Sequence, residues 1–183
     1  MELKGVRVRP WSPECRVVKS LLKSQIPEDE RMPFAVLRLG TLLTKRCDCT
    51  CFYEGSTPVG FYYLLLSEKA VFMLYLVVSP DVQSRGYGSA ILEEIRKRYP
   101  DCQVDLHIEI PKDPESKDEQ AAKRFRFYQR NGFLYTGWTT EDGGVRYWIL
   151  SSRGPAFDTE KHKEFLSRDR NSGTVVFNHE GGM

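Results

Sequence analysis

A glycine-rich stretch, Gln83-Ser84-Arg85-Gly86-Tyr87-Gly88-Ser89, separates a hydrophobic run from an amphipathic segment. The run, Val71 to Val78, is rich in β-branched and aromatic residues and too short to span a membrane, so we expect a buried strand. The segment after the glycines places Ile91, Leu92 and Ile95 on one helical face. A strand that turns into a helix in this way presents free backbone N–H groups at the positive end of the helix. We therefore expect this turn to hold a phosphate-bearing molecule.

Spacing excludes two familiar glycine motifs at this turn. The dinucleotide fingerprint needs a third glycine three residues after the second, and that position is Ile91 here. A Walker A loop needs lysine and a hydroxyl residue after its last glycine, whereas Gly88 is followed by Ser89 and Ala90. What remains is Gln-x-x-Gly-x-Gly before a small hydroxyl residue, in which Gly86 and Gly88 let the backbone approach a ligand closely. Taken alone, the pattern also fits a helix entry that binds nothing.

A second segment, Phe125 to Phe133, predicts the end of another helix. Ala121, Ala122 and Tyr128 fall at helical spacing with it, and Gly132 stands where a left-handed C-terminal cap belongs. Together the two segments resemble the Gcn5-related N-acetyltransferase (GNAT) superfamily. In that family Gln/Arg-x-x-Gly-x-Gly/Ala binds the pyrophosphate of acetyl-coenzyme A (acetyl-CoA), and a later helix ends in Phe/Leu-Tyr-x-x-x-Gly-Phe.

The resemblance implies an α/β fold, a three-layer α/β/α domain whose mixed, mostly antiparallel sheet splays at the cofactor site. It also implies that acetyl-CoA is the co-substrate, with its pyrophosphate at the glycine turn and its pantetheine arm along the preceding strand. The implied cofactor-binding residues are Leu76, Val77, Val78, Gln83, Ser84, Arg85, Gly86, Tyr87, Gly88 and Ser89.

The implied activity is transfer of an acetyl group to a primary amine of a small molecule or peptide by direct nucleophilic attack. The resemblance makes Tyr128 the general acid, and a phenol with a pKa of about 10 matches a thiolate leaving group of about 8.5. The chain departs from the family pattern in this helix, because Ala121 replaces a frequent asparagine and Arg124 a frequent alanine. The alternative is therefore a catalytically inactive coenzyme A-binding sensor or interaction module of the same fold.

The general base is less clearly marked. Some family members carry a glutamate in the strand before the glycine turn, but the equivalent position here is Phe72. The next strand, Val104 to Ile110, alternates apolar and polar residues, and its polar face carries Glu109 and His107. Either residue is a candidate base, and we favour Glu109. The rival interpretation is a solvated polar face, with water removing the proton.

Composition and charge limit the other function classes. The chain has 183 residues, 40% of them hydrophobic and 28% charged, which fits one globular domain. Its net charge of +2 is too small to indicate a nucleic-acid partner. No run approaches the roughly 18 apolar residues of a membrane helix, and we expect neither a membrane partner nor a signal peptide. We therefore expect a cytoplasmic protein.

The cysteines do not predict a metal site. Five cysteines, an odd number, fit a reducing compartment better than a disulfide framework. Cys47, Cys49 and Cys51 alternate along an expected strand, and no second cysteine or histidine pair complements them. We interpret them as small apolar strand residues.

The order of predicted elements divides the chain into residues 1–150, the GNAT-like domain, and residues 151–183, an appendage of the same domain. We expect Phe34 to Lys45 to form a helix and Asp142-Gly143-Gly144 to turn a hairpin. In the appendage, Asp158 is expected to cap a short helix through Arg168, and Thr174 to Phe177 to add an edge strand. The appendage is a candidate contact in a homodimer, or a lid over the acceptor cleft.

Overall fold

The computed structural model describes residues 3–28, 30–142, 144–166 and 178–179. The chain forms two compact units. The first unit contains Met1–Leu66 and Met73–Pro100, and the second contains Ser67–Phe72 and Asp101–Met183. Strand β4 (Ala70–Val78) contributes residues to both. The architecture is the predicted α/β fold with a mixed, mostly antiparallel sheet.

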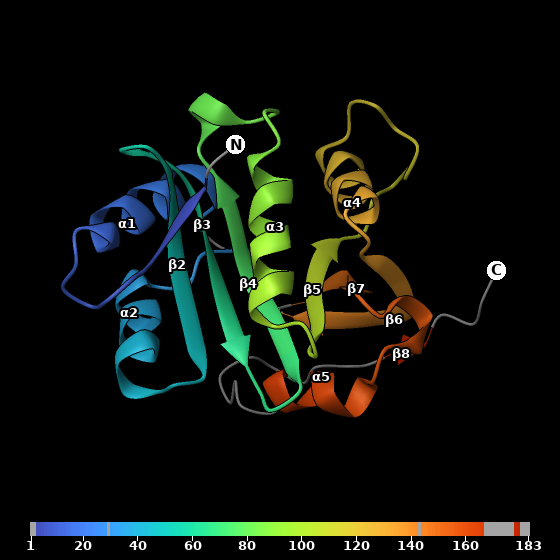
Figure 1. Cartoon of the computed structure of the whole chain (residues 1–183). Helices are drawn as coiled ribbons and strands as arrows, with labels where there is room; N and C mark the ends of the chain where they lie inside the picture. The colour runs from blue at the N-terminus through green and yellow to red at the C-terminus, as the bar shows by residue number, and fades with distance from the viewer. Residues whose placement is uncertain (1–2, 29, 143, 167–177, 180–183) are drawn as a thin grey trace. The chain divides into compact units, whose positions relative to one another are not determined.

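In the first unit, four strands follow one another in the order β1-β2-β3-β4. Antiparallel pairing joins β2 to both β1 and β3. Figure 1 shows α3 lying along the sheet face that β3 and β4 form. The elements of this unit are β1 (Lys4–Arg7), α1 (Glu14–Gln25), α2 (Phe34–Leu43), β2 (Cys47–Glu54), β3 (Thr57–Leu66), most of β4, the 3-10 turn η1 (Pro80–Val82) and α3 (Tyr87–Arg98).

The alternation of β2 explains how the first unit is packed. Cys47, Cys49 and Cys51 are buried, carry free thiols and lie in the hydrophobic core with residues of α1, α2 and β3. The prediction that they are small apolar strand residues is confirmed. Asp48 and Thr50, which alternate with the cysteines, are also buried and bind polar partners. Both faces of β2 are therefore covered.

In the second unit, the strand order is β4-β5-β7-β6-β8. Residues Ala70–Phe72 of β4 pair in parallel with Gln103–Asp105, over three residue pairs. The pairs β5–β7, β6–β7 and β6–β8 are antiparallel. The remaining elements are β5 (Gln103–Glu109), α4 (Gln120–Arg130), β6 (Leu134–Asp142), β7 (Val145–Ser151), the 3-10 turn η2 (Gly154–Ala156), α5 (Thr159–Leu166) and β8 (Asn178–His179).

The predicted helix cap at Asp158 and the predicted hairpin are both present, and the predicted helix from Phe34 is slightly shorter than expected. Asp158 caps α5, because its Oδ1 accepts hydrogen bonds from the backbone N–H groups of Glu160 and Lys161. The hairpin pairs Asp142 with Val145. Helix α2 ends at Leu43, two residues before the predicted end, where the backbone of Thr44 becomes extended. Residues 167–177, which include Arg168 and the predicted edge strand, lie outside the described residues, as does Gly143.

Candidate functional site

The predicted turn after β4 has an unusual backbone. Gly86 precedes the first residue of α3 and has a φ of 87°, in the left-handed region that glycine enters without a Cβ penalty. Ser84 also has a positive φ, 64°, and it alone does so among the described residues other than glycine. A non-glycine residue pays about 1–2 kcal/mol for that conformation. Such backbone strain is commonest where a loop is shaped for a ligand.

The start of α3 leaves backbone donors free. Its first intrahelical hydrogen bond runs from the N–H of Ala90 to the carbonyl of Gly86, at 3.1 Å. The N–H groups of Tyr87, Gly88 and Ser89 therefore have no acceptor within the helix, and no side chain caps this end. Free N–H groups at the positive end of a helix dipole form an anion site, so the local geometry fits a phosphate group.

Three side chains of the turn differ in what they contact. The Nε2 of Gln83 donates to the carbonyl of Val78 at 3.4 Å and to Oε1 of Gln25 at 3.2 Å. Tyr87 donates its hydroxyl to Glu54, and this hydrogen bond raises the pKa of the phenol. Arg85 is exposed and makes no ion pair with any described residue. Gln83 and Tyr87 thus brace the turn, whereas the Arg85 guanidinium is available to an anion.

The end of β4 is shaped by a glycine that the sequence analysis did not single out. A Cβ added at Gly60 of β3 would lie 2.4 Å from the carbonyl oxygen of Val77. Because no side chain fits there, a glycine is needed for this approach of β3 to the last residues of β4. Leu76 and Val78 are half-buried, and Val77 is buried. These are the three residues predicted to pair with the pantetheine arm.

Tyr128 lies in the last turn of α4, in the second unit. Gly132 has a φ of 78°, its N–H donates to the carbonyl of Gln129, and the N–H of Phe133 donates to that of Tyr128, each at 3.0 Å. These bonds form a Schellman motif, so the predicted glycine cap is confirmed. The Tyr128 ring packs against Phe127 and Phe133, with ring centroids 5.1 and 6.0 Å away.

The environment of Tyr128 keeps its hydroxyl protonated. The residue is 8% exposed, and burial raises the pKa of Tyr128 to about 12, although Arg124 opposes the shift. No described residue hydrogen-bonds its hydroxyl. The phenol is therefore a neutral donor at physiological pH.

Glu109, the predicted base, lies at the end of β5. It forms an ion pair with Arg124, the residue that replaces a frequent alanine of the family. Its Oε2 lies 3.4 Å from Nη1 of Arg124 on α4. Both side chains are nearly half exposed, so the ion pair adds little stability. The contact joins the polar face of β5 to the helix that carries Tyr128.

A chain of polar groups, buried at Asp105 and His162 and partly exposed at His107, was missed by sequence reasoning. Nδ1 of His162, on α5, lies 3.0 Å from Oδ2 of Asp105, and its Nε2 lies 2.9 Å from Nε2 of His107. Asp105 and His162 have no exposed surface. The alternation of β5 places Asp105 and His107 on one face, but nothing local in the sequence links them to a helix 55 residues later.

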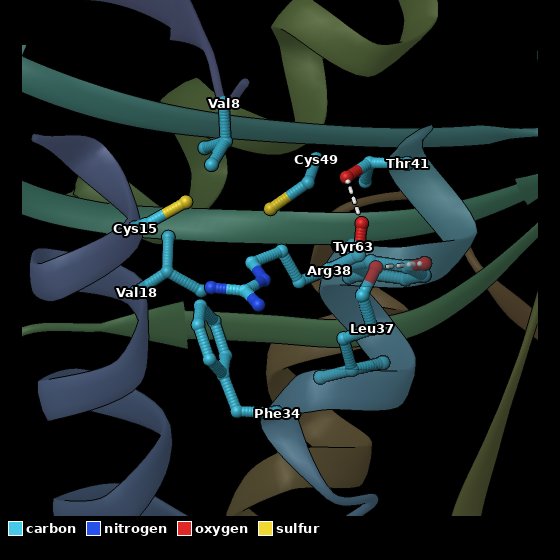
Figure 2. A pocket seen from close by; sticks show the side chains of 9 residues that line it. All are labelled: Val8, Cys15, Val18, Phe34, Leu37, Arg38, Thr41, Cys49 and Tyr63. Carbon is cyan, nitrogen blue, oxygen red and sulfur yellow. Dashed lines mark hydrogen bonds between the residues drawn. The ribbon is translucent and has the colours of Figure 1, made fainter. Parts of the chain in front are cut away.

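One small pocket occurs in the first unit, with a volume of about 240 Å³ that includes open solvent. Figure 2 shows the guanidinium of Arg38 reaching into it, and the same group lies 4.8 Å from the centre of the exposed Trp11 ring. An apolar lining with a cation gives a protonated amine no partner, so we assign the pocket no part in acceptor binding. It is lined by Val8, Cys15, Val18, Phe34, Leu37, Arg38, Thr41, Cys49 and Tyr63.

Two further properties concern the part of the chain that the structure describes. None of its helices is both long and apolar enough to cross a membrane. Nor do three or more of its histidine, cysteine, aspartate and glutamate side chains gather in a way that could hold a metal ion.

A family model matches the part of the chain that contains this geometry. Residues 45–134 match the model of the acetyltransferase (GNAT) domain, and this stretch includes both the glycine turn and Tyr128. No curated protein matches the chain.

Solved structures share the fold at low sequence identity. A GNAT-family protein from Bacteroides thetaiotaomicron is 19% identical, with a TM-score of 0.72 over 89% of this chain and 93% of its own. A variant of the spermidine N-acetyltransferase of Vibrio cholerae is 12% identical, with a TM-score of 0.61 over 81% and 92%. A GNAT acetyltransferase of Elizabethkingia anophelis, solved with acetyl-CoA bound, is 14% identical, with a TM-score of 0.56 over 81% and 96%.

Proposed function

We propose that this chain, whose residues 45–134 match the GNAT acetyltransferase domain, transfers an acetyl group from acetyl-CoA to a primary amine of a small molecule or peptide. The observation that carries this proposal is the strained turn before α3. Its backbone N–H groups lack partners at a helix N-terminus, as a pyrophosphate site requires. The similarity to an acetyl-CoA-bound structure supports the choice of donor.

Donor binding is assigned to residues of the first unit. The N–H groups of Tyr87, Gly88 and Ser89 would bind the pyrophosphate, and Arg85 would add a charge-assisted hydrogen bond. The backbone at Leu76, Val77 and Val78 would pair with the pantetheine arm, as a strand added to β4. Ser84 and Gly86 shape the turn, and Gln83 holds it through Val78.

The chemistry needs a donor for the developing oxyanion and a proton for the leaving thiolate. A backbone N–H in the Leu76–Val78 stretch would stabilise negative charge on the thioester oxygen. As the amine nitrogen bonds to the acetyl carbon and the carbon–sulfur bond breaks, Tyr128 would give its proton to the thiolate. The phenol is protonated when the reaction begins, as this role requires, and burial makes it a weaker acid than a free tyrosine. The amine proton must pass to a base on the polar face of β5, where Glu109 is the candidate from sequence.

The donor site is tested by calorimetry with acetyl-CoA. Gly86→Glu should abolish binding, because a carboxylate then stands at the anion site. Gly86→Ala carries the same left-handed backbone penalty without the charge, and it should keep most of the affinity. If the glutamate variant, folded by circular dichroism, binds as well as the wild type, the site is misplaced.

The reaction is tested by thiol release from acetyl-CoA over a panel of amines. The panel includes polyamines, because a spermidine N-acetyltransferase is among the similar structures. On an acceptor that the panel identifies, Tyr128→Phe should lower kcat by about 100-fold while leaving acetyl-CoA affinity unchanged. Intact turnover in this variant would refute the general-acid role. A wild type that binds acetyl-CoA but acetylates no amine would favour the alternative, a coenzyme A-binding module without catalysis.

A further inference from the structure

Helix α5 supplies a buried histidine to the polar face of β5. We propose that Asp105, His162 and His107 form a proton relay, and that His107 is the group that accepts the amine proton. The proposal rests on the proposed acetyl transfer and names the base of that reaction. It also gives a role to α5, which lies in the appendage that follows the family-like part of the chain.

The inner end of the relay is fixed by Asp105. Its Oδ2 lies 3.0 Å from Nδ1 of His162 and accepts a hydrogen bond from Nε2 of Gln103 at 2.7 Å. The Oε1 of Gln103 in turn accepts from the backbone N–H of Asp158 at 2.8 Å. Since a carboxylate can only accept, His162 carries a proton on Nδ1, and in the proposed relay its Nε2 presents a lone pair.

The outer end of the relay is His107. Its Nε2 lies 2.9 Å from Nε2 of His162, and it must donate there because His162 presents a lone pair. Nδ1 of His107 then carries a lone pair, and no described residue binds it. The ring is held between Phe72, at 4.7 Å between centroids, and Tyr147, at 6.4 Å. A positioned ring with one free basic nitrogen is what a general base requires.

The proton path is balanced in atoms and charge. Nδ1 of His107 takes the amine proton, and the Nε2 proton of His107 moves to Nε2 of His162. His107 is then neutral again, as its other tautomer, and His162 is an imidazolium beside the Asp105 carboxylate. The positive charge thus ends in an ion pair that burial strengthens. Release of the proton reverses the same steps.

The placement of the relay agrees with the proposed reaction within the second unit. His107 and Glu109 lie two residues apart on one face of β5, and Glu109 contacts Arg124 of α4. Arg124 is one helical turn from Tyr128. Glu109 already has a cation as partner, whereas His107 has a histidine that contacts a carboxylate.

The titratable and charged groups around His107 come from several elements. On β5 they are Asp105 and Glu109, on α5 His162, and on β7 Tyr147. β4 contributes the uncharged Phe72. Burial, with a contribution from His162, lowers the pKa of His107 well below its usual value, so the ring is neutral and able to accept a proton.

The test compares pH–rate profiles of the wild type and three variants, His107→Gln, Asp105→Asn and Glu109→Gln. The acceptor is the amine that the panel identifies, and its own titration is common to all four proteins. His107→Gln should lower kcat/KM by about 100-fold or more and remove the part of the acidic limb that the amine's own titration does not supply, with acetyl-CoA affinity unchanged. Asp105→Asn should move that limb to lower pH, because the protonated relay loses its stabilising negative charge.

Each outcome has one meaning. If His107→Gln keeps the wild-type profile, or if only Glu109→Gln removes the acidic limb, the relay is overturned and the acetyl transfer stands. If Asp105→Asn lowers activity without moving the limb, Asp105 and His162 only support the fold and the relay is again overturned. If the wild type neither binds acetyl-CoA nor releases thiol, the proposed function fails and the relay with it.

Discussion

Two buried carboxylates, one in each unit, are bound in opposite ways. Asp48 of β2 lies within 3.0 Å of the Arg98 guanidinium and accepts hydrogen bonds from the hydroxyls of Tyr62 and Tyr99. Asp105 of β5 is equally buried, but its partners are an amide and an imidazole, and its Oδ1 has no hydrogen-bond partner. The first carboxylate is satisfied by groups that stay protonated, and the second by groups that include a titratable one.

This difference separates a structural polar cluster from one that can move a proton. Burial by itself would raise the pKa of Asp48, but the hydrogen bonds from Tyr99, Arg98 and Tyr62 outweigh it and hold the pKa below its usual range. The guanidinium does not release its proton in proteins, so this charge pair is permanent. Around Asp105, by contrast, histidines are the only described side chains in the cluster that can carry a balancing charge. A fully satisfied network adds rigidity, whereas an incomplete one marks a candidate functional site.

The largest expected effect is a difference in stability between two matched substitutions. Asp48→Asn should lower the free energy of unfolding by about 2 kcal/mol, because charge-assisted hydrogen bonds in a buried site are lost. Asp105→Asn should change it by less than about 1 kcal/mol, because removing a buried charge with an unpartnered oxygen also removes a desolvation penalty.

Urea unfolding of the two variants and the wild type measures this difference. Both substitutions keep the side-chain volume, so each controls for the packing change in the other. Equal losses would contradict the distinction between the two clusters. A larger loss for Asp105→Asn would reverse it and make the β5 cluster the structural one.

The sequence could predict the features that neighbouring residues determine. The glycine turn and the Tyr128 helix end depend on spacing within a few residues, and the left-handed Gly86 and Gly132 follow from the same local pattern. The fold class was implied by the family resemblance that these local motifs carry, and the order of the predicted elements agreed with it. The burial of Cys47, Cys49 and Cys51 followed from strand alternation.

Features that depend on contacts between distant segments could not be predicted. His162 reaches His107 across 55 residues, and Arg98 reaches Asp48 across 50. Gly60 looks like an ordinary strand residue until β3 lies against Val77. These pairings depend on which elements pack together, and one sequence carries no local pattern for them. The general base was therefore the weakest part of the predicted site.

The smaller expected effect is on the pH dependence of stability. The cluster around Asp48 and the cluster of Asp105, His162 and His107 should lose stability over different pH ranges. A histidine whose pKa is lowered on folding binds protons more readily when unfolded, so its contribution is present above about pH 6.5 and is lost as the pH falls. Asp48 also has a lowered pKa, but its contribution is lost only as the pH falls below about 4. Between pH 6.5 and 5.5 the wild type should therefore lose about 1 kcal/mol through His107. Urea midpoints at the two pH values should show this loss in the wild type and in Asp48→Asn but not in His107→Gln. An unchanged loss in His107→Gln would mean that folding does not lower the pKa of His107.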